Sequence, residues 1–128
     1  YEDTIPPLKE LSQAGNRTAI VSNAPWGSPP HLWREQLRTI GLGIAADEIV
    51  MCGDIGWRKP APQIFQHAAS LLGVACEECL FVGDEPEWDV TGSSGVGMRA
   101  VLIDRTDTHP GHTGYRIRSL KEIGQCLA

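Results

Sequence analysis

The sequence predicts a single α/β domain, in which helices cover both faces of a parallel sheet. Strand-like and helix-like segments alternate along the chain, which favours parallel strands joined by right-handed helical crossovers. The strand-like segments are short, continuous apolar runs, as in strands that are buried on both faces. The chain has 128 residues, the length of one domain with a core of its own.

The first half of the chain contains two predicted helices and two predicted strands. Two prolines open the segment 5–15 and a glycine closes it, which is typical of a short helix. A β-branched apolar run at 18–23, TAIVSN, predicts a buried strand. Residues 31–40 place their apolar side chains near one helical face, and 48–52, EIVMC, form a second short strand.

The second half repeats this alternation. Residues 60–74 have an apolar stripe at helical spacing that ends at a glycine, which predicts a helix. A strand at 79–82 follows, and then a short helical or turn segment near 90–95. The chain closes with a strand at 99–103, RAVLI, and a helix from about 120 to 127.

Composition and charge exclude several classes of function. No apolar run approaches the roughly 20 residues that span a bilayer, so we expect no membrane segment. The net charge is -5 and basic residues are not clustered, which argues against nucleic acid and favours a cation or a cation-complexed substrate. No charged and then apolar leader follows Tyr1, so we expect a cytoplasmic protein.

The cysteines do not predict a metal or redox site. Cys76 and Cys79 form a C-x-x-C, but the sequence has no second such pair at the spacing of a zinc site. The pair also precedes a strand, whereas a redox motif opens a helix. We interpret it as structural.

Polar side chains gather after the predicted strands. The strand in LFVGDEPEWD ends at a glycine, and Asp84 and Asp89 follow it. Ser22 and Asn23 end an earlier strand, and Lys59 lies just before a helix in GWRKPAP. Ligands of open α/β sheets bind at the carboxyl ends of the strands, where these loops converge. A hydroxyl, an ammonium and two carboxylates suit magnesium-assisted phosphoryl transfer.

Each of these residues also has a purely structural interpretation. Ser22 can cap a turn, Lys59 can be a solvated side chain, and Asp89 can be a helix N-cap. Their joint position on converging loops favours function. Three tryptophans follow the motifs closely, and we expect each of them to be a packing residue: Trp26, Trp57 and Trp88.

The three segments TAIVSN, GWRKPAPQIF and LFVGDEPEWD resemble, in order and spacing, motifs two, three and four of the haloacid dehalogenase superfamily of hydrolases. The resemblance covers almost the whole chain and implies a Rossmann-like three-layer sandwich. It implies that Ser22 and Lys59 hold the transferring group, and that Asn23 contributes its backbone or amide to the same pocket. It further implies that Asp84 and Asp89 serve a Mg²⁺ site, Asp84 commonly as a direct ligand and Asp89 often through water or the lysine.

The family's first motif, D-x-D-x-T or D-x-D-x-V, has no match in this sequence. Asp3 precedes a helix, and Asp104 and Asp107 lie at the far end of the chain. Residues 1–128 therefore resemble one partial core domain that lacks the first, central strand, the cap and the nucleophilic aspartate. We expect the isolated chain to be inactive, and either to self-associate or to pair with a missing N-terminal segment.

Three functions remain open. The first is a magnesium-dependent phosphatase that acts on a small phosphorylated metabolite through an aspartyl-phosphate. The second is a haloacid dehalogenase, which needs no metal and hence no pair of carboxylates such as Asp84 and Asp89 around a cation. The third is a non-catalytic binding module with the same fold. The substrate itself stays unknown, because the absent cap would select it.

Overall fold

A computed structural model describes residues 5–22, 35, 47–51 and 56–126 of the chain. Helices and strands alternate in it, as the sequence predicts. In chain order they are α1 (Ile5–Gln13), β1 (Ala19–Ser22), β2 (Glu48–Met51), α5 (Pro62–Leu72), η1 (Cys76–Glu78), β3 (Leu80–Gly83), η2 (Pro86–Thr91), α6 (Gly92–Ser94), β4 (Arg99–Ile103), β5 (Tyr115–Ile117) and η3 (Leu120–Cys126).

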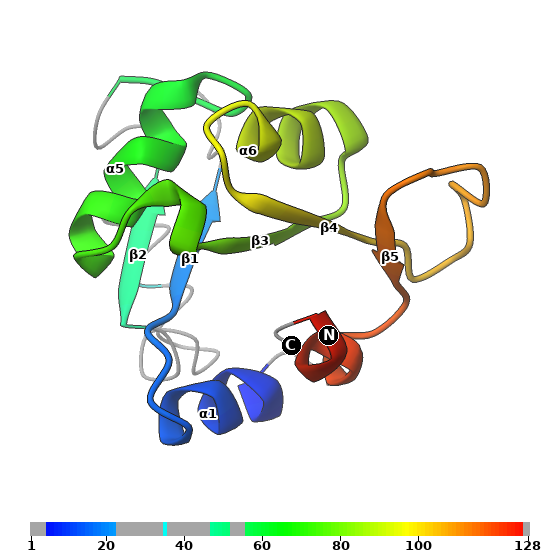
Figure 1. Ribbon diagram of the computed structural model, residues 1–128, viewed down its shortest axis with the longest axis horizontal. Helices are drawn as coiled ribbons and strands as arrows, with labels where there is room; N and C mark the ends of the chain where they lie inside the picture. The colour runs from blue at the N-terminus through cyan, green and yellow to red at the C-terminus, as the bar shows by residue number, and fades with distance from the viewer. Residues whose placement is uncertain (1–4, 23–34, 36–46, 52–55, 127–128) are drawn as a thin grey trace.

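All the described strand pairs are parallel, and they form two groups. Strand β1 pairs with β2, and the second sheet has the order β3-β4-β5. Figure 1 shows α5 and α6 on one side of the strands and α1 and η3 on the other. The prediction of a Rossmann-like α/β fold with helices on both faces is confirmed.

Helix α5 illustrates how local sequence sets the fold. Pro62 occupies the first turn, where a missing N–H costs no hydrogen bond. Gly73 ends the helix with a left-handed φ of 74°, and its N–H donates to the Ser70 carbonyl. Between these ends, Ile64 and Phe65 are fully buried. The Phe65 and Phe81 rings pack edge to face, with 5.0 Å between their centroids. This contact fixes α5 against β3.

Strand β4 is buried on both faces, which explains its unbroken apolar sequence. Val101 and Ile103 pack with Ile117 and, on the same side, with Leu120 of η3. Leu102, between them in sequence, is also fully buried. Because successive residues of a strand point to opposite faces, both sides of β4 must be covered.

The C-x-x-C lies at η1 and is structural, as predicted. Cys76 and Cys79 are free thiols that pack against the core built around α5. Burial raises the pKa of the Cys79 thiol, and Cys76, Glu78 and Glu77 raise this pKa further. The Cys79 thiol therefore stays protonated at neutral pH, unlike a redox-active cysteine.

Three sequence-based expectations need correction or fall outside the described residues. Strand β5 is absent from the prediction, because its three residues lie in a polar stretch and are held mainly by pairing with β4. The last helix is a 3₁₀ helix, Leu120–Cys126, and not a regular α-helix. The helix predicted at 31–40 lies outside the described residues, except for Glu35, which is helical and exposed. No helix in the described ranges is both long and apolar enough to cross a membrane.

Candidate functional site

The candidate site forms where β1 and β3 end. Strand β3 ends at Gly83, and Asp84 follows it as an exposed residue. Strand β1 ends at Ser22, whose backbone is in register with Met51 of β2. Lys59 precedes α5 and is largely buried. Lys59 contacts the turn that follows β3, whereas the end of β1 is positioned by its pairing with β2.

Asp89 owes its position to a π-helical turn, η2. The backbone N–H groups of Asp89 and Val90 both donate to the Glu85 carbonyl, at 2.9 and 3.3 Å. The Oδ2 atom of Asp89 accepts the Glu85 N–H at 3.1 Å, and the Ser93 hydroxyl donates to the Asp89 carbonyl at 2.6 Å. Such widened turns are rare and often occur at functional sites.

Gly83 makes room for this carboxylate. A Cβ atom at Gly83 would overlap the Cβ, Cγ and Oδ2 atoms of Asp89. The absence of a side chain at the end of β3 therefore allows the Asp89 carboxylate to lie against the strand backbone. The glycine that the sequence marks only as a turn is a steric requirement of the site.

Lys59 and Asp89 form a largely buried ion pair. The Nζ of Lys59 lies 2.7 Å from Oδ1 of Asp89, and their side chains are 14% and 3% exposed. Oδ1 has no hydrogen bond of good geometry, so the attraction is mainly between the charges. The Nζ also lies 5.7 Å from the centroid of the Phe81 ring, within the range of a cation–π contact. Two contacts therefore fix the position of the ammonium group.

The acidic residues of the loop have different environments. Asp84, Glu85 and Glu87 are exposed, whereas Asp89 is 2% exposed. Within the described ranges, no group of three or more His, Cys, Asp or Glu side chains is placed to hold a metal ion. A cation can reach the exposed Asp84 carboxylate from solvent. The Asp89 carboxylate instead pairs with Lys59. The described residues thus fit only part of a magnesium site.

Two of the predicted site residues cannot be placed against Lys59. Asn23 lies outside the described residues, and so does the side chain of Ser22. The backbone of Ser22 places its Cα at the end of β1, as the sequence predicts. The shared anion site of Ser22 and Lys59 therefore stays a prediction.

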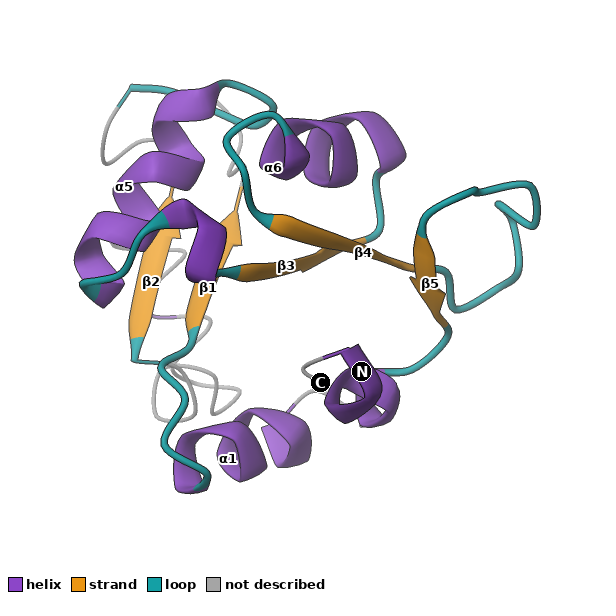
Figure 2. Cartoon of the chain, in the orientation of Figure 1, coloured by secondary structure: helices purple, strands orange, loops and turns teal. Residues whose placement is uncertain are grey.

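A pocket of about 550 Å³ is lined by residues of β1 and β3. Figure 2 draws these two strands as orange arrows. Apolar residues of both strands line it, and α1 and η3 contribute further apolar residues to its wall. The lining residues of β1 and β3 are Ala19, Ile20, Val21, Leu80, Phe81 and Val82. Lys59 also lines the pocket, which therefore extends to the ion pair. In the part of the chain that the structure describes, β1 and β3 do not pair with each other.

A second buried carboxylate, Asp104, follows β4. It accepts hydrogen bonds from the Thr108 and His109 N–H groups at 2.9 and 2.7 Å and from Arg116 at 2.9 Å. Burial alone would raise its pKa, but these bonds and one from the Thr108 hydroxyl outweigh burial and hold the pKa of Asp104 well below its usual range. Arg116 also contacts Asp107 at 2.6 Å. The group fixes the loop between β4 and β5.

Sequence reasoning missed this group, since it considered Asp104 and Asp107 only as alternatives for the absent first motif. The signal that could have identified this group is an arginine at the second position of a short strand, with two aspartates upstream of it. Trp57 and Trp88, which we expected to be packing residues, are 49% and 46% exposed, and the Trp88 ring contacts Arg58. Trp26 lies outside the described residues.

Comparisons with known proteins place this geometry in a family. The model of the haloacid dehalogenase-like hydrolases matches residues 1–97. Phosphoserine phosphatase of Thermus thermophilus is 38% identical over 119 residues, which cover 91% of this chain and 46% of that protein. The (S)-2-haloacid dehalogenase 1 of a Pseudomonas species is 30% identical and covers 99% of this chain and 56% of that protein.

A crystal structure of a haloacid dehalogenase-superfamily phosphatase from Thermococcus onnurineus superposes with a TM-score of 0.90 at 35% identity. It covers 100% of this chain, while this chain covers 58% of that protein. The chain spans about half the length of the curated relatives it matches.

Proposed function

The chain belongs to the haloacid dehalogenase-like hydrolases, and from that premise we propose that the protein hydrolyses phosphate esters of small metabolites. One observation carries the proposal. Lys59 is held at 2.7 Å from a buried carboxylate of the turn that follows β3. A fixed ammonium at this position can bind a tetrahedral anion and stabilise charge that develops on its oxygens. The phosphatases among the relatives support this choice.

The residues of the chain have distinct roles in this proposal. Lys59 and the hydroxyl of Ser22 bind phosphoryl oxygens, and Asn23 contributes its backbone or amide. Asp89 does not touch the substrate but orients Lys59. Asp84 is the exposed carboxylate that would bind Mg²⁺, which would offset phosphate charge when it is present.

The nucleophile of the proposed reaction is a carboxylate outside this chain. It attacks phosphorus as the bond to the leaving-group oxygen breaks, and the departing oxygen takes up a proton. Water then cleaves the resulting acyl-phosphate, releasing inorganic phosphate and regenerating the carboxylate. In this reaction Lys59 neutralises charge on the phosphoryl oxygens in both steps.

The pocket between β1 and β3 supports a site for the segment that carries this nucleophile. Both strands present an edge without a strand neighbour among the described residues, and the pocket between them is apolar and extends to Lys59. A parallel strand inserted there would pair with both edges, and its carboxyl end would lie beside the ammonium group. We therefore propose that the 128-residue chain by itself is inactive.

The experiment compares two proteins on a generic phosphate ester with and without Mg²⁺. One is the 128-residue chain, and the other is expressed from the complete coding sequence. We expect magnesium-dependent phosphate release only from the second. Turnover by the 128-residue chain alone contradicts the role of an added segment. If the complete protein releases phosphate from none of the esters tested, the phosphatase proposal is wrong and a non-catalytic module is favoured.

Dehalogenation is the second candidate function. Two relatives are (S)-2-haloacid dehalogenases. The argument from two metal carboxylates is also weaker than it would be if both were open to a cation, because Asp89 contacts Lys59. Lys59 could equally bind the carboxylate of a 2-haloacid. Chloride release from 2-chloropropionate that is insensitive to a metal chelator would favour this function, whereas phosphate release that the chelator abolishes would favour the phosphatase.

A further inference from the structure

Phe81 of β3 is the aromatic residue that contacts the ammonium group of Lys59. The Nζ atom of Lys59 lies over the Phe81 ring, 5.7 Å from the ring centroid, which is within the range of a cation–π interaction. Phe81 and Lys59 also line the same pocket. The contact between ring and ammonium therefore lies at the wall of the proposed site.

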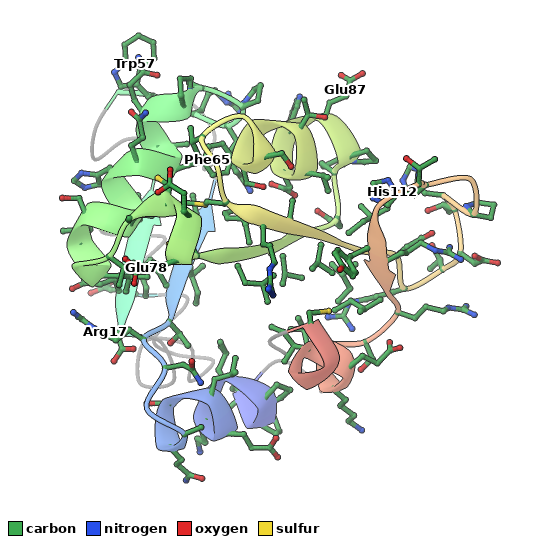
Figure 3. All side chains as sticks on the ribbon, viewed as in Figure 1. Arg17, Trp57, Phe65, Glu78, Glu87 and His112 are labelled. Carbon is green, nitrogen blue, oxygen red and sulfur yellow. The ribbon has the colours of Figure 1, made fainter. Side chains whose placement is uncertain are left out.

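The Phe81 ring is fixed by the buried core behind it. Phe65 is fully buried and packs edge to face against Phe81, with 5.0 Å between the ring centroids. Gly92 of α6 leaves space for Phe65, because a Cβ atom at Gly92 would lie 2.8 Å from Cε2 of the Phe65 ring. Figure 3 shows Phe65 where α5 faces α6. Close packing on this side keeps the Phe81 ring in its place beside Lys59.

The two contacts of the ammonium group differ in charge. The Asp89 carboxylate attracts Lys59 strongly, but its negative charge also cancels much of the positive charge that a bound anion would experience. The face of an aromatic ring attracts a cation through its quadrupole and carries no net charge. The Phe81 ring can therefore hold Lys59 in position without offsetting its charge.

We propose that Phe81 is a positioning residue, and that the face of its ring holds the Lys59 ammonium where it binds the phosphoryl group. The inference rests on the proposed phosphatase function and adds a residue to its site. A phenylalanine that only fills the core needs apolar volume, whereas this role needs the electron density of the ring face. Ring fluorination separates the two, because it withdraws electron density from the face and changes the size of the side chain little.

The test measures phosphate release from p-nitrophenyl phosphate by protein expressed from the complete coding sequence. Phenylalanine analogues with one, three and five ring fluorines replace Phe81 through a reassigned codon. We expect kcat/KM to fall in steps with the number of fluorines, by about tenfold with five. The matched control is pentafluorophenylalanine at Phe65, which is buried in the core and is not among the residues that line the pocket. This control should change kcat/KM by less than about twofold.

Two ordinary substitutions complete the series. Phe81→Tyr keeps the ring face and should retain kcat/KM within about threefold, whereas Phe81→Leu keeps apolar volume without a ring and should lose about tenfold. Melting temperatures of all variants show whether a loss of activity reflects unfolding. They also test the contact apart from activity. Fluorination of Phe81 should lower the melting temperature when Lys59 is present, and change it little in Lys59→Met/Asp89→Leu, which has no ammonium group.

The opposite outcomes are distinct. Equal kcat/KM across the fluorine series overturns the inference, since the ring would then act only by its volume. An equal loss with fluorinated Phe65 also overturns it, because a general effect on the core would explain both. If the unmodified protein releases no phosphate from any ester, the phosphatase proposal is wrong and the role of Phe81 in binding the phosphoryl group is wrong with it. The melting temperatures, which need no activity, then show whether the ring still contacts the ammonium.

Discussion

The Nζ of Lys59 and the Oδ1 of Asp89 lie 2.7 Å apart, although 30 positions of sequence separate the two residues. The pair ties the segment before α5 to the π-helical turn after β3. Both side chains are at least 86% buried, so neither charge is well solvated without the other. The site and the stability of the fold therefore depend on the same contact.

Removing one charge of this pair should destabilise the protein strongly. Lys59→Met leaves the Asp89 carboxylate buried without its counter-charge, so we expect the free energy of unfolding to fall by about 3 kcal/mol. The double variant Lys59→Met/Asp89→Leu buries no charge and should recover much of that loss. Urea unfolding of the single and double variants measures the coupling. Additive losses would show that the two charges do not interact.

Gly83→Ala should disrupt the site through sterics alone. The added methyl group would overlap the Asp89 side chain, which must move away from β3 and from Lys59. We expect a loss of about 1–3 kcal/mol of stability, typical of overpacking, together with weaker phosphate binding.

Gly124→Ala is the matched control for this substitution, because a Cβ atom at Gly124 has no neighbour within 4 Å. It should change stability by less than about 1 kcal/mol and leave phosphate binding intact. Equal effects of the two substitutions would show that the overlap with Asp89 is relieved at little cost. Thermal melts and phosphate titrations measure both quantities.

Asp104 should make the stability of the protein depend on acid pH. Its folded-state pKa is lowered, so the unfolded chain binds the proton more tightly, and the stabilisation is fully present above the unfolded pKa of about 3.9. It is lost as pH falls below that value toward the folded pKa. Asp104→Asn should lower the melting temperature at pH 7, and this difference from the unmodified protein should shrink as pH falls below about 4.

The control for the acid dependence is Glu87→Gln, which neutralises an exposed carboxylate. Its melting curves should follow those of the unmodified protein at every pH. A constant difference between Asp104→Asn and the unmodified protein across the pH range would contradict the titration and leave only a packing effect.

These contacts show how far sequence reasoning extends. The apolar run at 99–103 and the glycine after α5 determine β4 and the helix end, because their signals are local. The resemblance to known motifs predicts that Lys59 and Asp89 lie at one edge of the sheet. Their direct contact depends on the π-helical turn and on Gly83, which has no side chain to fill the space of Asp89. Strand β5 depends on its partner β4, and a three-residue polar stretch carries no signal of its own.

Magnesium should bind weakly, with Asp84 as its contact. Asp84 is exposed at the end of β3, whereas Asp89 already contacts Lys59. Mg²⁺ keeps several of its waters when few carboxylates are offered, so the isolated chain should bind it with low affinity. An NMR titration should shift the Asp84 amide before that of Glu87. Tight binding that Asp84→Ala leaves unchanged would contradict this assignment.

The edges of β1 and β3 that face the pocket should be open in the isolated chain. Among the strands that the structure describes, β4 has a neighbour on each side, whereas β1 and β3 each have one. We therefore expect amides of β1 and β3 to exchange with solvent faster than those of β4, since unpaired N–H groups are not protected. Size-exclusion chromatography at rising concentration should show self-association, because open edges are templates for pairing.

Adding a separate segment that carries the family's first motif, D-x-D-x-T or D-x-D-x-V, tests what enters the pocket. If a strand inserts between β1 and β3, exchange of both should slow by at least about tenfold, self-association should cease, and β4 should stay unchanged as the internal control. Phosphate release should begin at the same ratio of segment to chain that saturates this protection. Protection of β1 and β3 in the isolated chain equal to that of β4 would show that the pocket is closed. Slower exchange of β1 and β3 without phosphate release would support the inserted strand but show that this strand does not carry the nucleophile.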